Sequence, residues 1–78
     1  RAKHAALYAR RGELARAQFY IRRINNSELA NAESLWLGVR VENRLGNRDA
    51  QEQLAGQLRR RFPQSPEVGQ LERGAFND

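Results

Sequence analysis

Apolar residues recur along the chain at steps of three and four, the spacing of one face of an α-helix. The clearest stripe consists of Leu14, Ala17, Ile21 and Ile24. Apolar residues at positions 5–9 fit the end of an earlier helix, and Gly12 is expected to stop it in a left-handed conformation. Residues 11–13 are then a tight turn. This pattern predicts a first, partial helical hairpin over residues 1–24.

A second hairpin is predicted over residues 28–63. Its first helix is capped by Ser27 or Asn31 and ends at Gly46, since Asn and Ser favour caps and Gly favours helix ends. The apolar residues of that helix spread over more than one face, as expected for a helix covered on two sides: Leu35, Trp36, Leu37, Val39, Val41 and Leu45.

The second helix of this hairpin carries apolar residues at steps of four, namely Ala50, Leu54, Leu58 and Phe62. Asp49 and Glu52 form a capping-box-like pair at its start, and Pro63 closes it. A short capping helix is predicted over residues 65–76, because Ser65 and Pro66 are typical of a helix start. The prediction is an all-α chain of about five helices in one small domain.

Repetition narrows this prediction. Gly12 and Gly46 are 34 residues apart, the period of the tetratricopeptide repeat (TPR). Two stretches resemble the pattern of small and large residues in this repeat. One copy has Leu37-Gly38 followed by Ala50-x3-Leu54, and an earlier copy has Ala17-x3-Ile21. Small residues at these positions let two antiparallel helices approach closely. The expected architecture is therefore the antiparallel hairpins of a TPR solenoid.

Four stretches support a more specific resemblance: residues 17–20 with Ala-Gln-Phe-Tyr, residues 31–40 with Ser-Leu-Trp-Leu-Gly, residues 57–67 with Leu-Arg-Arg-Arg-Phe-Pro, and the tail at 72–76. Together they resemble the C-terminal TPR part of the type IV pilus biogenesis and stability proteins, the PilW (PilF) family. The resemblance covers nearly the whole chain.

This resemblance implies a non-enzymatic, pilotin-like lipoprotein on the periplasmic side of the bacterial outer membrane. Such a scaffold assists localisation and assembly of the pilus secretin through protein–protein contacts. Because the chain opens at Arg1 in mid-pattern, we expect it to be part of a longer protein. The lipid anchor and further repeats would then lie upstream, and the resemblance assigns no secretin-binding residue here.

Enzymatic chemistry has little support in the sequence. There is no cysteine, His4 is the only histidine, and no phosphate-binding glycine motif occurs. The acids Glu13, Glu33, Asp49 and Glu67 each fall in the first turn of a predicted helix, where the helix dipole favours them. We therefore expect no catalytic residue, no metal site and no cofactor.

The excess of positively charged residues is the strongest argument for a different function, nucleic-acid binding. The net charge is +5, and thirteen of the fourteen cations are arginine, values typical of nucleic-acid-binding domains. Most arginines, however, fall in the last turn of predicted helices, where cations are favourable: Arg10, Arg11, Arg22, Arg23, Arg44 and 59–61. No aromatic residue is expected to interleave with them as a stacking platform. Nucleic-acid binding is thus the weaker alternative.

Candidate partner contacts are limited to Trp36, Arg40 and Arg44. Trp36 is expected to fill the core between hairpins, although it would become the leading contact if it faced a concave groove. The other open alternative is a generic peptide-binding TPR adaptor.

Overall fold

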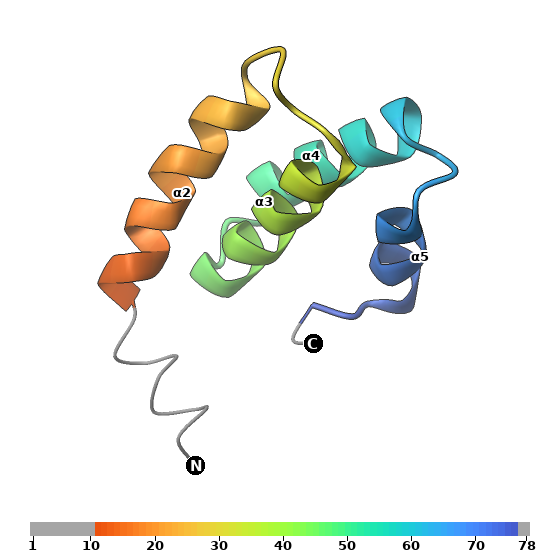
Figure 1. The fold of residues 1–78 in the computed structure, drawn as a ribbon. Helices are drawn as coiled ribbons and strands as arrows, with labels where there is room; N and C mark the ends of the chain where they lie inside the picture. Colours follow the sequence, from red (N-terminus) through yellow and green to blue (C-terminus); the bar gives the residue numbers. More distant parts are fainter. Residues whose placement is uncertain (1–10, 77–78) are drawn as a thin grey trace.

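The computed structural model describes residues 11–76, which form four α-helices (Figure 1). These are α2 (Arg11–Asn25), α3 (Ala32–Leu45), α4 (Arg48–Arg61) and α5 (Pro66–Arg73). Successive helices run in opposite directions, and α3 contacts each of the other three (Figure 1). The all-α class is confirmed for this part of the chain, with four helices and no strand in residues 11–76.

The expected turn at residues 11–13 is wrong, because all three residues belong to the first turn of α2. Gly12 does not adopt a positive φ. Glycine permits a left-handed turn without requiring one, since it populates negative φ equally well. The earlier helix expected to end there lies outside the described residues, and residues 11–76 contain four of the about five predicted helices.

The other helix ends follow the predicted cap chemistry closely. Of the two candidates, Asn31 caps α3: its side chain accepts from the Ser34 amide at 2.7 Å, and the Ser34 hydroxyl accepts from the Asn31 amide at 2.8 Å. Gly46 ends that helix with φ +79°. Ser65 caps α5, which ends at Arg73 because Gly74 takes φ +69°. The last helix is thus shorter than the expected 65–76.

The predicted capping pair of Asp49 and Glu52 is also wrong. The residue at the N-cap of α4 is Asn47, and its side chain makes no capping hydrogen bond. Its amide instead donates to the carboxylate of Glu42, at 2.9 Å. Because the Asn47 side chain is bonded to Glu42, it is not available to cap α4.

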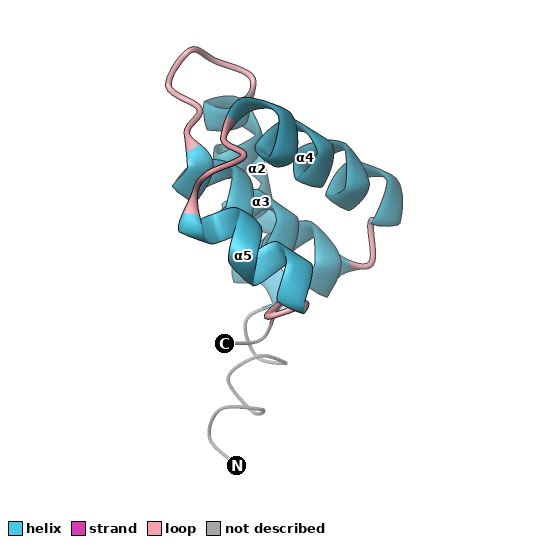
Figure 2. Ribbon diagram, turned by 90° about the vertical axis from the view of Figure 1, so that its right-hand side faces the viewer, coloured by secondary structure: helices cyan, strands magenta, loops and turns pink. Residues whose placement is uncertain are grey.

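The main core lies where α3, α4 and α5 meet, and α5 lies against both of the other helices (Figure 2). Leu35, Val39 and Leu58 are completely buried. Trp36 is 4% exposed, and its ring lies 5.7 Å from that of Phe76, which follows α5. The expectation that Trp36 fills the core is confirmed.

Helix α3 is closely approached from both sides at Gly38. A Cβ atom there would lie 2.8 Å from Nδ2 of Asn25 in α2 and 2.9 Å from Cδ1 of Leu54 in α4. The Asn25 side chain is held in place, since Nδ2 donates to the Ser34 carbonyl at 3.0 Å and Oδ1 accepts from the Ser34 hydroxyl at 2.7 Å. Gly38 is therefore small because two helices share the space beside it.

Substituting Gly38 by alanine should destabilise the fold. Alanine is favoured over glycine in a helix by about 1 kcal/mol, but the added methyl overlaps the fixed Asn25 amide and the buried Leu54, at a cost of about 1–3 kcal/mol. We expect a net loss in the free energy of unfolding measured by urea denaturation. Gly69→Ala in α5 is the matched control, because only the flexible Arg73 guanidinium lies near, at 3.7 Å. That variant should be neutral or stabilised, and equal stabilisation of both variants would contradict the close approach at Gly38.

Candidate functional site

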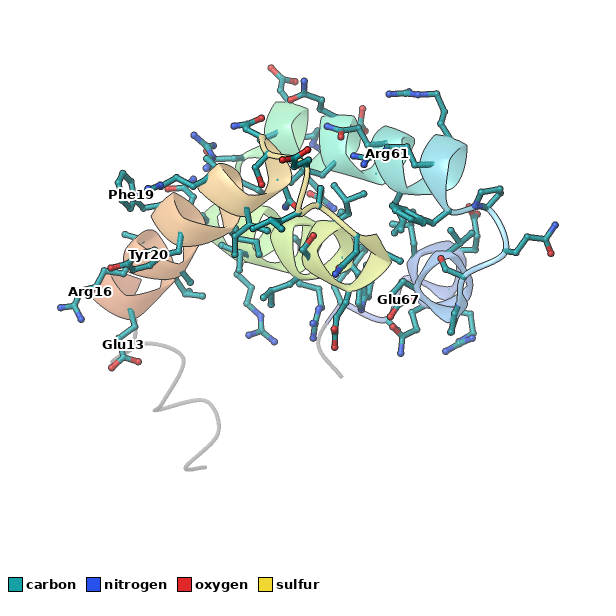
Figure 3. The ribbon with its side chains drawn as sticks, turned by 45° about the horizontal axis from the view of Figure 1, so that its top comes forward. Glu13, Arg16, Phe19, Tyr20, Arg61 and Glu67 are labelled. Atoms are coloured by element: carbon teal, nitrogen blue, oxygen red, sulfur yellow. The ribbon has the colours of Figure 1, made fainter. Side chains whose placement is uncertain are left out.

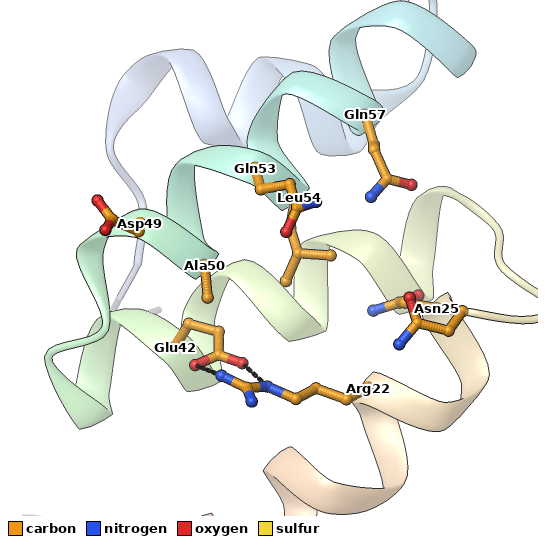
Figure 4. Close-up of a pocket in the computed structure, with 9 residues that line it drawn as sticks. Arg22, Asn25, Glu42, Asp49, Ala50, Gln53, Leu54 and Gln57 are labelled. Atoms are coloured by element: carbon orange, nitrogen blue, oxygen red, sulfur yellow. Dashed lines mark hydrogen bonds and ion pairs between the residues drawn. The ribbon is translucent and has the colours of Figure 1, made fainter.

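A groove with a volume of about 530 Å³ lies between α2 and α4, with part of α3 at its base (Figure 4). Its lining is mostly polar: Arg22, Asn25, Asn26, Glu42, Asp49, Ala50, Gln53, Leu54 and Gln57. Hydrogen-bonding side chains thus come from three elements that are separate in the sequence.

The groove contains a buried carboxylate. Glu42 is 0% exposed, and its oxygens accept four hydrogen bonds. Arg22 donates from Nε at 2.7 Å and from Nη2 at 3.2 Å, while the side-chain amides of Gln18 and Asn47 donate at 3.0 and 2.9 Å. A buried charge is tolerated when it is paired and its remaining lone pairs are bonded, and Glu42 meets both conditions.

These contacts determine the ionisation of the pair. Burial raises the pKa of the Glu42 carboxyl, but the hydrogen bonds from Arg22, Asn47 and Gln18 lower it by more, so the pKa lies below its ordinary value. The hydrogen bond to Glu42 raises the pKa of Arg22. Both groups stay charged at neutral pH, and the saturated carboxylate is unsuited to act as a general base.

Sequence reasoning did not single out this network, although a signal is present. Gln18 and Arg22 are one helical turn apart, so both reach across the same face of α2. Glu42 follows Leu35 and Val39 at the spacing of the buried stripe of α3. An acid on an apolar stripe, opposite a Gln-x3-Arg pair, could have been identified from the pattern alone.

The three candidate contacts named from the sequence lie on α3, apart from this groove. Trp36 is buried, and the guanidinium of Arg40 lies over its ring at 5.4 Å from the centroid. Arg40 and Arg44 are half-buried and one turn apart, and the Nε of each is buried with no hydrogen-bond partner among the described residues. With exposed Leu37 they form one stripe, which we call the α3 face.

The arginines lie largely where the helix dipole favours them. The last turns of α2, α3 and α4 contain Arg22, Arg23, Arg44 and Arg59–Arg61. The first-turn acids are likewise Glu13, Glu33, Asp49 and Glu67. Arg11 was placed wrongly, since it begins α2; Arg10 and His4 lie outside the described residues.

One premise against nucleic acid is wrong: aromatic residues do lie among the arginines of α2. Phe19 and Tyr20 are exposed, and the Arg23 guanidinium lies 5.8 Å from the Phe19 ring centroid. In the sequence, Phe19 and Tyr20 stand between Arg16 and Arg22, in the middle of α2.

Within residues 11–76, no three potential metal ligands from His, Cys, Asp and Glu come together. None of the helices in this range has the length and apolar character needed to cross a bilayer. In the comparisons with known proteins, no family model, curated protein or solved structure matches the chain.

The Glu42 network predicts a defined pH dependence of stability. The pKa of Glu42 is lower in the folded chain than its ordinary value of 4.5, which applies to the unfolded chain. The network therefore contributes fully above that pH, and its contribution is lost as the pH falls through the folded-state pKa. We expect Glu42→Gln to cost about 1–3 kcal/mol at neutral pH, with a smaller loss of stability on acidification than in the wild type.

Urea denaturation at a series of pH values measures this effect. The control is Glu72→Gln, which removes an exposed ion pair with Arg59 (2.9 Å) and should cost less than about 1 kcal/mol. Parallel pH profiles for the wild type and Glu42→Gln would show that the buried carboxylate does not govern acid stability.

Proposed function

We propose that the chain is a non-enzymatic TPR scaffold that acts in type IV pilus biogenesis by contacting the outer-membrane secretin. Two independent lines support this: the sequence blocks that resemble the PilW (PilF) family, and the arrangement of the helices. The proposal includes a periplasmic position and a lipid anchor upstream of these residues.

The observation that carries the repeat part of the proposal is the packing around Gly38. Ile21 of α2 and Leu54 of α4 occupy the large-residue positions of the two predicted repeat copies, and both approach Gly38, the small position of α3. Stacked helical hairpins need such alternation of small and large residues. The contacts of α5 with both α3 and α4 continue the same stacking.

The α3 face is the proposed secretin contact. It presents an exposed apolar side chain, Leu37 at 41%, beside two cations. Arginine is enriched at protein interfaces, because its planar guanidinium binds carboxylates and packs on aromatic rings. A generic peptide-binding adaptor would use the same face, so the two functions differ only in the partner.

Binding of the purified periplasmic part of the secretin to the chain tests this proposal. We expect saturable binding, weakened roughly fivefold or more (about 1 kcal/mol) by Arg40→Ala or Arg44→Ala. Arg60→Ala on α4 is the control and should bind like the wild type. Far-UV circular dichroism checks that each variant keeps its helix content.

Each alternative has its own outcome in this experiment. Absence of secretin binding would contradict the pilus assignment, and binding of unrelated acidic peptides through the α3 face would favour the adaptor. Saturable binding of DNA or RNA at physiological salt would favour the nucleic-acid alternative, which the aromatic residues on α2 keep open.

A further inference from the structure

The outer side of α2 exposes two large aromatic side chains. Phe19 is 60% and Tyr20 61% exposed, and their rings meet edge to face at a centroid distance of 5.7 Å and an angle of 73°. Both project from α2 away from α3 (Figure 3). Single exposed apolar residues are common on protein surfaces, but an ordered aromatic pair is a much larger apolar area to leave in water.

Two arginines flank this pair. Arg16 and Arg23 are exposed, and neither forms an ion pair with any carboxylate of the described residues. They are seven residues apart, about 10.5 Å along the helix axis. We call these four residues the basic aromatic face.

The basic aromatic face is distinct from the packed side of α2. The packed side uses Ile21 and Asn25 against α3, together with the ion pair of Arg22. A concavity of about 610 Å³ lies beside Phe19 and is lined by Ala15, Gln18, Phe19, Arg22, Arg23 and Asn26. The small side chain of Ala15 leaves room next to the ring for an apolar side chain from outside.

We propose that the basic aromatic face binds an acidic amphipathic helix of a protein partner. Carboxylates two turns apart on that helix would pair with Arg16 and Arg23, and an aliphatic residue between them would pack on Phe19 and into the concavity. The spacing agrees because side chains seven residues apart on any α-helix are also about 10.5 Å apart. This inference rests on the proposed scaffold function and adds a second contact surface, separate from the α3 face.

The ring geometry favours a protein partner over single-stranded nucleic acid. Base stacking needs a free ring face, preferably several in succession. One face of Phe19 is covered by the Arg23 guanidinium, and Tyr20 meets Phe19 edge-on. Arg16 and Arg23 also span only about 10.5 Å of α2, which is a short track for the phosphate backbone of a nucleic acid.

A designed peptide tests the proposal on the full chain. The probe is a lactam-bridged helix with two glutamates seven residues apart and two leucines between them; a matched peptide carries lysines in place of the glutamates. Affinity is measured by titration calorimetry, and the contact is located by ¹⁵N–¹H NMR shifts. Anionic phosphatidylglycerol vesicles and a single-stranded DNA oligomer are the further probes.

We expect saturable binding of the acidic peptide only, with amide shifts concentrated at residues 15–24. Arg16→Glu/Arg23→Glu should weaken binding by tenfold or more, and Phe19→Ser/Tyr20→Ser should weaken it to a similar extent. Arg48→Glu/Arg60→Glu on α4 makes the same change in net charge at exposed positions and should leave the affinity within about twofold.

Three results would overturn the inference: no saturable binding of the acidic peptide, equal weakening by the α4 control, or tighter binding of vesicles or DNA through the same four residues. The secretin experiment separates this failure from that of the proposed function. Secretin binding through the α3 face without peptide binding would leave the scaffold intact and remove only the second surface. Peptide binding without secretin binding would support the basic aromatic face and contradict the pilus function.

Discussion

The arrangement of α2 against the rest of the chain depends on the buried carboxylate of Glu42. A completely buried charge is tolerated only if donors surround it, and its donors come from α2 and from the turn between α3 and α4. The network therefore sets both the position of α2 and the path of the chain after Gly46. Because hydrogen bonds need defined distances and angles, it specifies one arrangement where apolar contacts alone would tolerate several.

Steric and polar constraints act together at the other end of the interface between α2 and α3. Gly38 lies one turn before Glu42, on the side of α3 where α2 and α4 both approach. The Asn25 side chain fills the space that Gly38 leaves and bonds to Ser34, which also belongs to the cap of α3. One asparagine thus joins the end of α2 to the start of α3. A larger side chain at position 38 would therefore displace Asn25 and disturb both helix ends.

The two proposed contact surfaces lie outside the packed core, one on α3 and one on α2. On α3 the stripe consists of exposed Leu37 with the half-buried Arg40 and Arg44, and on α2 it is the exposed aromatic pair with its two arginines. Helix-end arginines have a local reason in the helix dipole, whereas Arg16 and Arg40 lie in helix interiors, where no dipole accounts for them. Charge alone does not separate a protein-binding surface from a nucleic-acid-binding one. The neighbouring rings bear on this choice, because base stacking needs a free ring face and the Arg23 guanidinium lies over one face of Phe19.

The sequence by itself determined the all-α class, the apolar stripes and most helix ends, because caps and left-handed glycines act over a few residues. It also placed Trp36 in the core. Tertiary structure decided the rest: Asn47 bonds Glu42 and leaves α4 without a side-chain cap. Gly12, whose type equally allows a helix to end, lies in the first turn of α2. The Glu42 network and the aromatic pair among the arginines of α2 depend on contacts or exposure across helices. The sequence contains a signal of each feature, an acid on an apolar stripe and two aromatic residues between arginines. Local propensity, however, carries no information about which side of a helix another element will cover, so only the packed helices show which contacts form and which rings stay exposed.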